Sequence, residues 1–176
     1  MSIQIRPATL DDAPALSRLG AETFRDTFEG ANTPGDMARY LADAFTPAQQ
    51  AAEIADPAGA VLLAEEFDGA ELLGYAHLLS GPAPDGVPGI APIELKRLYV
   101  ARAWHGRGVA QALMDAALDT ARDRGAETLW LGVWERNPRA VAFYAKNGFV
   151  RVGQHTFVLG GDAQTDWLFA RPVTGI

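Results

Sequence analysis

A predicted strand that leads through a glycine-containing turn into an amphipathic helix constrains this chain more than any other feature. Leu98-Tyr99-Val100 ends the strand, and His105-Gly106-Arg107-Gly108-Val109-Ala110 follows after four linking residues. Apolar residues then recur every three or four positions, which predicts a helix over residues 106–124. Two glycines at alternate positions let the backbone approach a ligand closely, and N–H groups at a helix start bind anions. The turn therefore predicts either a phosphate site or only a tight strand-to-helix connection.

Strands and helices of ordinary length fill the rest of the chain. Strands are predicted over residues 3–5, 60–66, 71–79, 92–100, 128–134, 149–158 and 165–171, and helices over 9–28, 33–45, 46–55, 106–124 and 137–146. Thr9, Thr33-Pro34, Thr46-Pro47 and Asn137-Pro138 mark helix starts. Asp68-Gly69 predicts a hairpin turn, and residues 81–89 a loop. This order favours an α/β or α+β fold in one domain spanning residues 1–176.

Composition excludes several classes of protein. The chain has 176 residues and no Cys, so it has no thiolate metal site and no cysteine nucleophile. No His/Asp/Glu cluster has metal-ligand spacing, and we expect no metal. There is no basic stripe for nucleic acid. Without a signal peptide or a membrane-length apolar run, we expect a cytoplasmic protein.

The two halves of the chain carry opposite net charge. Residues 1–90 hold four Arg against 14 Asp and Glu, a net charge of −10. Residues 91–176 hold 11 Lys and Arg against eight Asp and Glu, a net charge of +3. The difference predicts either ligands of opposite sign or an ordinary solvated surface.

A second informative segment spans residues 137–149. Asn137 follows a strand of nearly continuous apolar character and can cap a helix. Tyr144 lies seven residues later, two turns away on roughly the same helix face. Its hydroxyl serves either catalysis or the packing of a core aromatic residue.

These two segments resemble the GNAT superfamily of N-acetyltransferases, in element order over nearly the whole chain. The resemblance implies a central mixed, mostly antiparallel sheet of about seven strands flanked by helices, and acetyl-CoA as cofactor. It also implies a bulged strand at Leu98, Tyr99 and Val100 whose backbone holds the pantetheine arm. The family's Arg/Gln-x-x-Gly-x-Gly/Ala signature corresponds to His105, Gly106, Arg107, Gly108, Val109 and Ala110, with His105 departing from the first position. Asn137 matches a pantetheine contact and Tyr144 the general acid. Lys146 is either a contact to the phosphate end of the cofactor or a solvated surface lysine.

Further segments are similar to the PaiA-type polyamine N-acetyltransferases, which acetylate spermidine and spermine. They are residues 22–28, residues 40–45, residues 130–135 and Gln164-Thr165-Asp166. Glu22, Asp26 and Glu29 are spaced four and three apart, on one helix face. That acidic stripe predicts either a binding surface for a flexible polycation or a solvated face.

An ammonium acceptor must lose a proton before it attacks, because its reference pKa is about 10.4. Glu94, on the strand that ends at residue 100, is the preferred general base, with a surface charge as the alternative. His77 and His155 are weaker candidates for the base. Lys96 and Arg97 are predicted to point to opposite faces of their strand. Without Cys, direct transfer in a ternary complex is preferred to an acyl-enzyme.

Two other functions remain open. The acceptor amine belongs to a polyamine or, alternatively, to an amino acid, an amino sugar or a protein N-terminus. A non-catalytic regulator that binds coenzyme A is the alternative from another class. Exposed strand edges are compatible with a homodimer, which is a family-level expectation.

Overall fold

The computed structural model describes residues 2–67 and 71–174, so the predicted Asp68-Gly69 turn lies outside the described residues. A single sheet runs through the molecule in the order β1-β2-β3-β4-β5-β7-β6. Its strands are β1 (Ile3–Pro7), β2 (Gly59–Glu66), β3 (Leu72–Ser80), β4 (Ile93–Val100), β5 (Thr128–Trp134), β6 (Val150–Leu159) and β7 (Asp162–Pro172). Among these described strands, only β4 and β5 run parallel. The predicted seven-stranded, mostly antiparallel sheet flanked by helices is confirmed.

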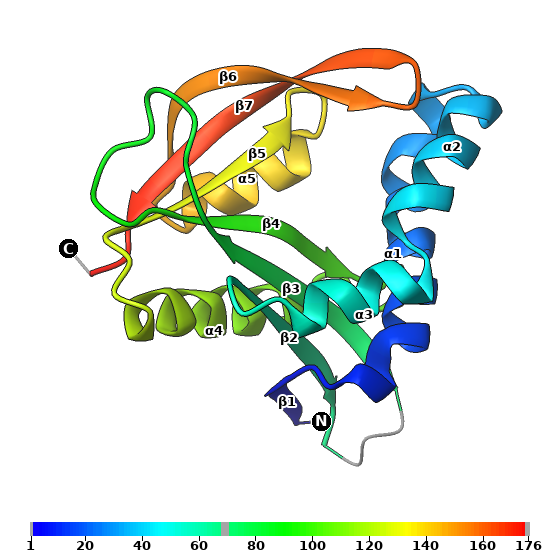
Figure 1. Cartoon of the computed structure of the whole chain (residues 1–176), viewed down its shortest axis with the longest axis horizontal. Helices are drawn as coiled ribbons and strands as arrows, with labels where there is room; N and C mark the ends of the chain where they lie inside the picture. The colour runs from blue at the N-terminus through cyan, green and yellow to red at the C-terminus, as the bar shows by residue number, and fades with distance from the viewer. Residues whose placement is uncertain (1, 68–70, 175–176) are drawn as a thin grey trace.

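Helices cover both faces of the sheet (Figure 1). They are α1 (Ala13–Phe28), α2 (Pro34–Ala44), α3 (Pro47–Ala55), α4 (Val109–Asp123) and α5 (Pro138–Lys146). Apolar residues of α4 and α5 join the largest buried cluster, and α1 and α2 join two smaller clusters on the opposite face. Among the residues that the structure describes, no helix combines the length and the hydrophobicity that a membrane span needs.

Three of the predicted helix starts form as expected. The hydroxyl of Thr33 accepts a hydrogen bond from the amide of Asp36, and that of Thr46 accepts one from Gln49. The side-chain oxygen of Asn137 accepts one from the amide of Ala140. Each cap satisfies an N–H group that a helix start leaves without a partner.

The starts of two helices differ from prediction. Residues 10–12 form a 3₁₀ turn after Thr9, and α1 begins at Ala13. α4 begins at Val109 rather than at residue 106, because Gly106 and Gly108 have φ angles of 75° and 86°. This left-handed backbone belongs to a turn and strongly favours glycine.

β4 contains a bulge at Lys96. Arg97 pairs with His77 and Leu95 with Leu78, so Lys96 is an extra residue in the strand. The resemblance placed the bulge at residues 98–100; the register shift lies two residues earlier. A bulge changes which side chains share a face.

β4 and β5 are paired only at one end. Their register pairs are Ile93 with Leu129 and Glu94 with Trp130. Beyond those pairs the two strands separate, which leaves the second half of β4 paired with β3 alone.

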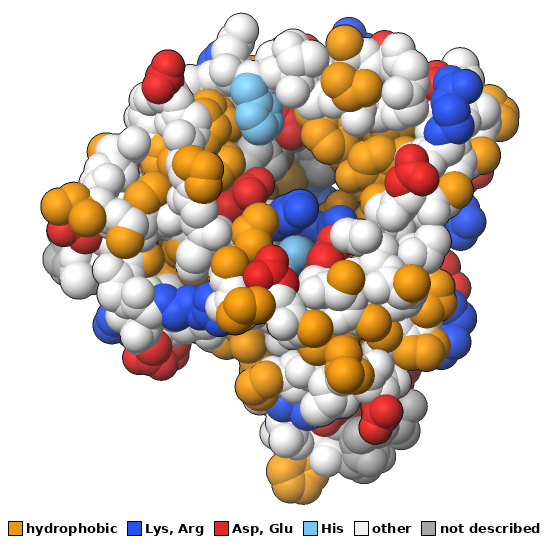
Figure 2. Space-filling view, viewed as in Figure 1, with side chains coloured by type: hydrophobic (Ala, Val, Ile, Leu, Met, Phe, Trp, Pro, Cys, Tyr) orange, Lys and Arg blue, Asp and Glu red, His pale blue; other side chains and the backbone are white. Residues whose placement is uncertain are grey.

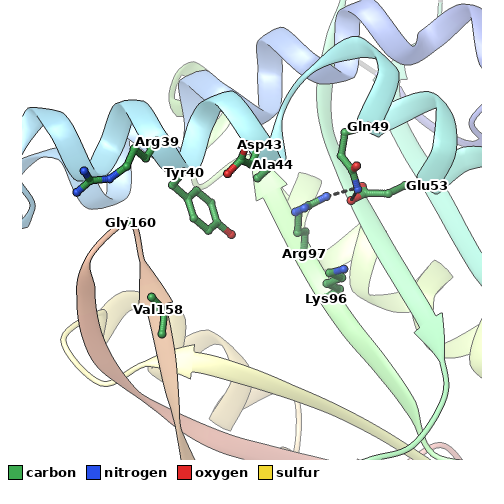
Figure 3. A pocket seen from close by; sticks show the side chains of 10 residues that line it. All are labelled: Arg39, Tyr40, Asp43, Ala44, Gln49, Glu53, Lys96, Arg97, Val158 and Gly160. Atoms are coloured by element: carbon green, nitrogen blue, oxygen red, sulfur yellow. Dashed lines mark hydrogen bonds and ion pairs between the residues drawn. The ribbon is translucent and has the colours of Figure 1, made fainter.

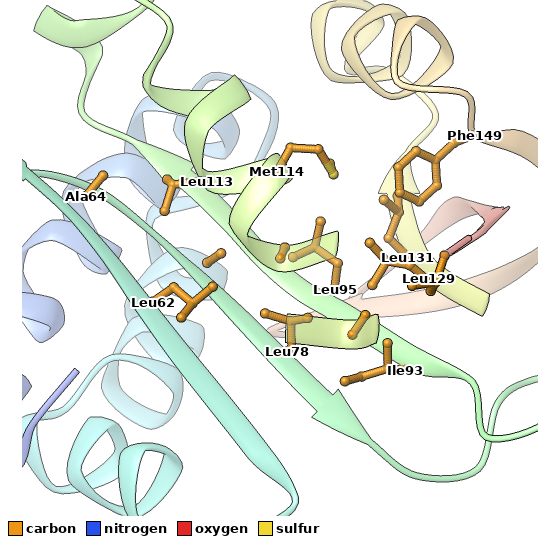
Figure 4. Packing of buried hydrophobic residues seen from close by; sticks show 14 of the residues in the cluster. Leu62, Ala64, Leu78, Ile93, Leu95, Leu113, Met114, Leu129, Leu131 and Phe149 are labelled. Carbon is orange, nitrogen blue, oxygen red and sulfur yellow. The ribbon is translucent and has the colours of Figure 1, made fainter. Parts of the chain in front are cut away.

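Packing against α4 fixes the position of β4 and β5. Leu78, Leu95 and Leu129 from three neighbouring strands meet Leu113 and Met114 of α4 (Figure 4). All five are at most 3% exposed. Truncating such a leucine to alanine typically lowers the free energy of unfolding by about 2–5 kcal/mol. Core packing against α4 therefore holds β4 and β5 in place where they begin to separate.

Candidate functional site

A cleft of about 770 Å³ lies where β4 and β5 have separated, between the end of β4, the start of α4, and α5. Ten of the twelve residues predicted to contact the cofactor line it: Leu98, Tyr99, Val100, His105, Gly106, Gly108, Ala110, Asn137, Tyr144 and Lys146. The strand end and the asparagine–tyrosine helix, distant in sequence, therefore form one cavity.

The other two predicted contacts do not line this cleft. Arg107 is exposed and places its guanidinium 5.1 Å from the centre of the Trp104 ring. Val109 is buried in the core beside Leu113. Between His105 and Ala110 the turn thus presents glycine backbone to the cleft, while the side chains of Arg107 and Val109 are directed elsewhere.

His105 connects the two walls of the cleft. Its Nε2 lies 2.9 Å from the carbonyl oxygen of Val100, and Nη1 of Arg139 lies 2.6 Å from its Nδ1. Since Arg139 is a donor, Nδ1 accepts and Nε2–H donates to Val100. The residue that departs from the family signature therefore links β4 to α5.

Positive charge surrounds the cleft. Arg102, Arg136, Arg139 and Lys146 line it, against the single carboxylate of Asp26. A helix N-terminus and several basic side chains together suit a ligand with several phosphates. The sequence patterns did not predict these three arginines as site residues. Arg136 and Arg139 could have been found because they flank the Asn137 cap.

Tyr144 has the setting of a proton donor. Its ring packs edge-on against Phe143 and Phe149, with centroids 5.5 and 5.6 Å away. Burial raises the pKa of the Tyr144 hydroxyl, so the phenol keeps its proton at neutral pH.

Of the predicted base Glu94 and the three residues of the acidic stripe, most do not line the cleft. Glu94 is half-buried on β4 and lines neither this cleft nor the second cavity. Burial raises the pKa of its carboxyl. Glu22, Asp26 and Glu29 are exposed on and just after α1, and of these three only Asp26 lines the cleft.

A second cavity of about 500 Å³ lies between α2, α3, β4 and the β6–β7 hairpin (Figure 3). It is lined by Arg39, Tyr40, Asp43, Ala44, Gln49, Glu53, Lys96, Arg97, Val158 and Gly160. Lys96 and Arg97 were predicted to face apart, yet both line it, because the bulge breaks the strand's alternation. Charged groups of both signs also ring the hollow in Figure 2.

A buried ion pair forms one wall of the second cavity. Nη1 of Arg97 donates to Oε2 of Glu53 at 2.6 Å, and Gln49 donates to Oε1 at 3.1 Å. Nδ1 of His77 lies 3.5 Å from the same carboxylate. Burial lowers the pKa of His77 to about 4, so it is neutral at pH 7 and unsuited to act there as a charged group.

Comparisons with known proteins find similarity to N-acetyltransferases in each case. A family model described as "Acetyltransferase (GNAT) family" matches residues 21–149. An uncharacterized N-acetyltransferase of Lactobacillus delbrueckii subsp. lactis is 35% identical over 169 residues, which are 96% of each chain. Another, from Mycobacterium bovis, is 38% identical over 162 residues, 92% of this chain and 98% of that one. The PaiA N-acetyltransferase of Thermoplasma acidophilum, solved with coenzyme A, shares the fold, with a TM-score of 0.78 over 98% and 99% of the chains at 20% identity.

Proposed function

The chain belongs to the acetyltransferase (GNAT) family, and we propose that it transfers the acetyl group of acetyl-CoA to a primary amine in a ternary complex. The observation that carries this proposal is the basic cleft that joins the glycine turn to Tyr144. Direct transfer fits a chain without a cysteine nucleophile.

The residues of the cleft fit coenzyme A. The free edge of β4 at residues 98–100 suits the amides of pantetheine, because β5 has already separated from it. The glycine turn and the basic side chains suit the phosphates. When bound, acetyl-CoA would supply a thioester-activated acetyl group, whose C–S bond breaks as the C–N bond forms.

Two side chains of this protein would move protons. Tyr144, which lines the cleft and keeps its proton, would donate to the leaving sulfur. Glu94, which does not line the cleft, would accept a proton from the attacking nitrogen through intervening water. Burial raises the pKa of Glu94, which brings a carboxylate closer to the operating pH and makes it a better base.

A polyamine is the proposed acceptor. The exposed acidic stripe and the carboxylate of Asp26 at the cleft support a cationic substrate. The second cavity carries both signs of charge, and its Glu53 is already paired with Arg97. A polycation would therefore rest mainly along α1, with only one amine entering the site.

Coenzyme A release should be fastest with spermidine and spermine in a panel that also holds putrescine, lysine, glucosamine and a short peptide. A thiol-reactive dye suits this assay, because the protein has no thiol. Asp26→Asn should raise the spermidine KM about two- to fivefold, as loss of an exposed ion pair does. Asp123→Asn, also exposed but on α4, is the control. Fast turnover of lysine or glucosamine instead would leave acetyl transfer in place and refute the polyamine.

Gly108→Ala should weaken coenzyme A binding about tenfold. A side chain there meets no neighbour within 4 Å, yet the φ of 86° costs an L-residue about 1–2 kcal/mol. The turn must then either change shape or bind under strain. Calorimetric titration with coenzyme A measures the loss. Gly35→Ala, at an exposed glycine of α2 with equally open surroundings, is the matched control. Unchanged affinity in Gly108→Ala would show that the turn does not touch the cofactor.

A further inference from the structure

We infer that Asp166 of β7 removes the first proton from the acceptor's ammonium group and passes it to solvent through His155. This inference rests on the proposed function and deepens it, since it adds a catalytic residue on the acceptor side. Neither the glycine turn nor Tyr144 takes part in it.

Asp166 and His155 lie next to each other beside Gly132 of β5, which has no side chain. Asp166 pairs in register with Trp134 on one side and with His155 on the other. Oδ2 of Asp166 lies 3.8 Å from Nε2 of His155. A Cβ atom added at Gly132 would lie 3.2 Å from that Oδ2 and 3.0 Å from that Nε2. Gly132 is exposed although its neighbours Leu131 and Val133 are buried, so glycine there keeps a small space open beneath the pair.

Asp166 lines neither cavity itself, but it lies close to residues of both. Trp134, the register partner of Asp166, lines the cofactor cleft. Tyr40 lines the second cavity, and the pKa of its hydroxyl is raised by burial and, in smaller part, by the charge of Asp166. The central hollow of Figure 2 lies in this region, among β6 and β7, α2 and β4. An amine that approaches the cleft from the hollow would meet Asp166.

The carboxylate of Asp166 lacks the partners that a structural carboxylate normally has. The residue is 8% exposed, and Oδ1 has no hydrogen-bond partner among the residues that the structure describes. Burial raises the pKa of Asp166 to about 6, against the opposing effect of His155. A buried, ionised oxygen without a donor is costly, and an ammonium group would satisfy it.

Two protons leave the nitrogen when an ammonium becomes an amide, and we assign one to Asp166 and the other to Glu94. First, an N–H bond of the ammonium breaks and an O–H bond forms on Asp166, which leaves a neutral amine and a carboxylic acid. His155, whose side chain is 37% exposed, then passes this proton to water. The second proton leaves as the C–N bond forms and reaches Glu94 through intervening water. The charged groups that act on Glu94 are Lys96 and Arg97 of β4 and His155 of β6. The titratable group on α2 that responds to the charge of Asp166 is Tyr40.

A matched pair of small amines separates the two proton transfers. Ethylamine is an ammonium ion at neutral pH, whereas methoxyamine, of nearly the same size, is uncharged and needs only the second transfer. Asp166→Asn should lower kcat/KM for ethylamine about 10²-fold and leave methoxyamine within about threefold. Glu94→Gln should slow both amines. Asp119→Asn, an exposed carboxylate on α4, should slow neither.

A second readout needs neither cofactor nor turnover. In the unliganded protein, the carboxyl ¹³C resonance that disappears in Asp166→Asn should titrate near pH 6. It should also shift when ethylamine is added but not with methoxyamine. Equal slowing of both amines, or a resonance that titrates as an ordinary Asp and ignores ethylamine, would overturn the inference. Wild-type protein that acetylates neither amine nor any member of the acceptor panel would instead remove the proposed function, and this inference with it.

Discussion

Replacing Tyr144 with Phe should lower the turnover of the preferred acceptor at least about 10²-fold, with the affinity for coenzyme A nearly unchanged. General acid catalysis by a positioned side chain typically contributes 10²–10⁴-fold, and Phe cannot donate a proton. The packing should survive, because Tyr144 meets the rings of Phe143 and Phe149 edge-on and Phe keeps that ring. Steady-state kinetics and calorimetric titration with coenzyme A measure the two quantities.

Tyr75→Phe is the matched control for this prediction. The hydroxyl of Tyr75 is buried and has no hydrogen-bond partner within the described ranges. Its removal should therefore lower neither the turnover nor the affinity for coenzyme A. If Tyr144→Phe retained turnover within about threefold, the acid role would be wrong. A loss of coenzyme A affinity equal to the loss of turnover would mean that the hydroxyl binds the cofactor instead.

Local signals predicted the helices of this protein well. Thr33, Thr46 and Asn137 each cap a helix from within three residues, so a short stretch of sequence contains the whole interaction. The start of α4 was predicted too early because apolar periodicity does not report φ. The positive φ of Gly106 and Gly108 makes them part of the turn.

The cleft at the glycine turn was easier to predict than the second cavity and the surroundings of Asp166. The cleft is built largely from two continuous segments, at residues 98–110 and 137–146. The second cavity and the surroundings of Asp166 combine residues that only the tertiary fold brings together. Glu53 and Arg97 are 44 residues apart, and Asp166 meets Gly132 through the pairing of β7 with β5. The bulge at Lys96 then reversed the faces that simple alternation assigns.

Breaking the buried pair of Glu53 and Arg97 should have the largest effect on stability. Arg97→Met leaves the Glu53 carboxylate buried beside His77, and loss of one partner of a buried pair costs about 3–5 kcal/mol. The double variant Glu53→Gln with Arg97→Met should recover much of that loss, since no charge is left unpaired. Arg122→Met, which breaks an exposed pair with Asp119, should cost at most about 1 kcal/mol. Urea unfolding measures all four proteins.

The pH dependence of unfolding tests whether the unpaired Glu53 carboxylate causes the destabilisation of Arg97→Met. In the wild type, burial is the largest single effect and would raise the pKa of Glu53, but the hydrogen bond and charge of Arg97, with smaller effects of Gln49 and His77, together lower it below its ordinary value. Its contribution is therefore present above the unfolded pKa and is lost as the pH falls through the folded value. In Arg97→Met only burial and weaker contacts remain, so the folded pKa rises above the unfolded one and stability falls as the pH increases. The deficit of Arg97→Met should thus be greatest near pH 7 and shrink toward pH 4; a deficit independent of pH would mean that lost packing against Phe45, and not the unpaired charge, destabilises the variant.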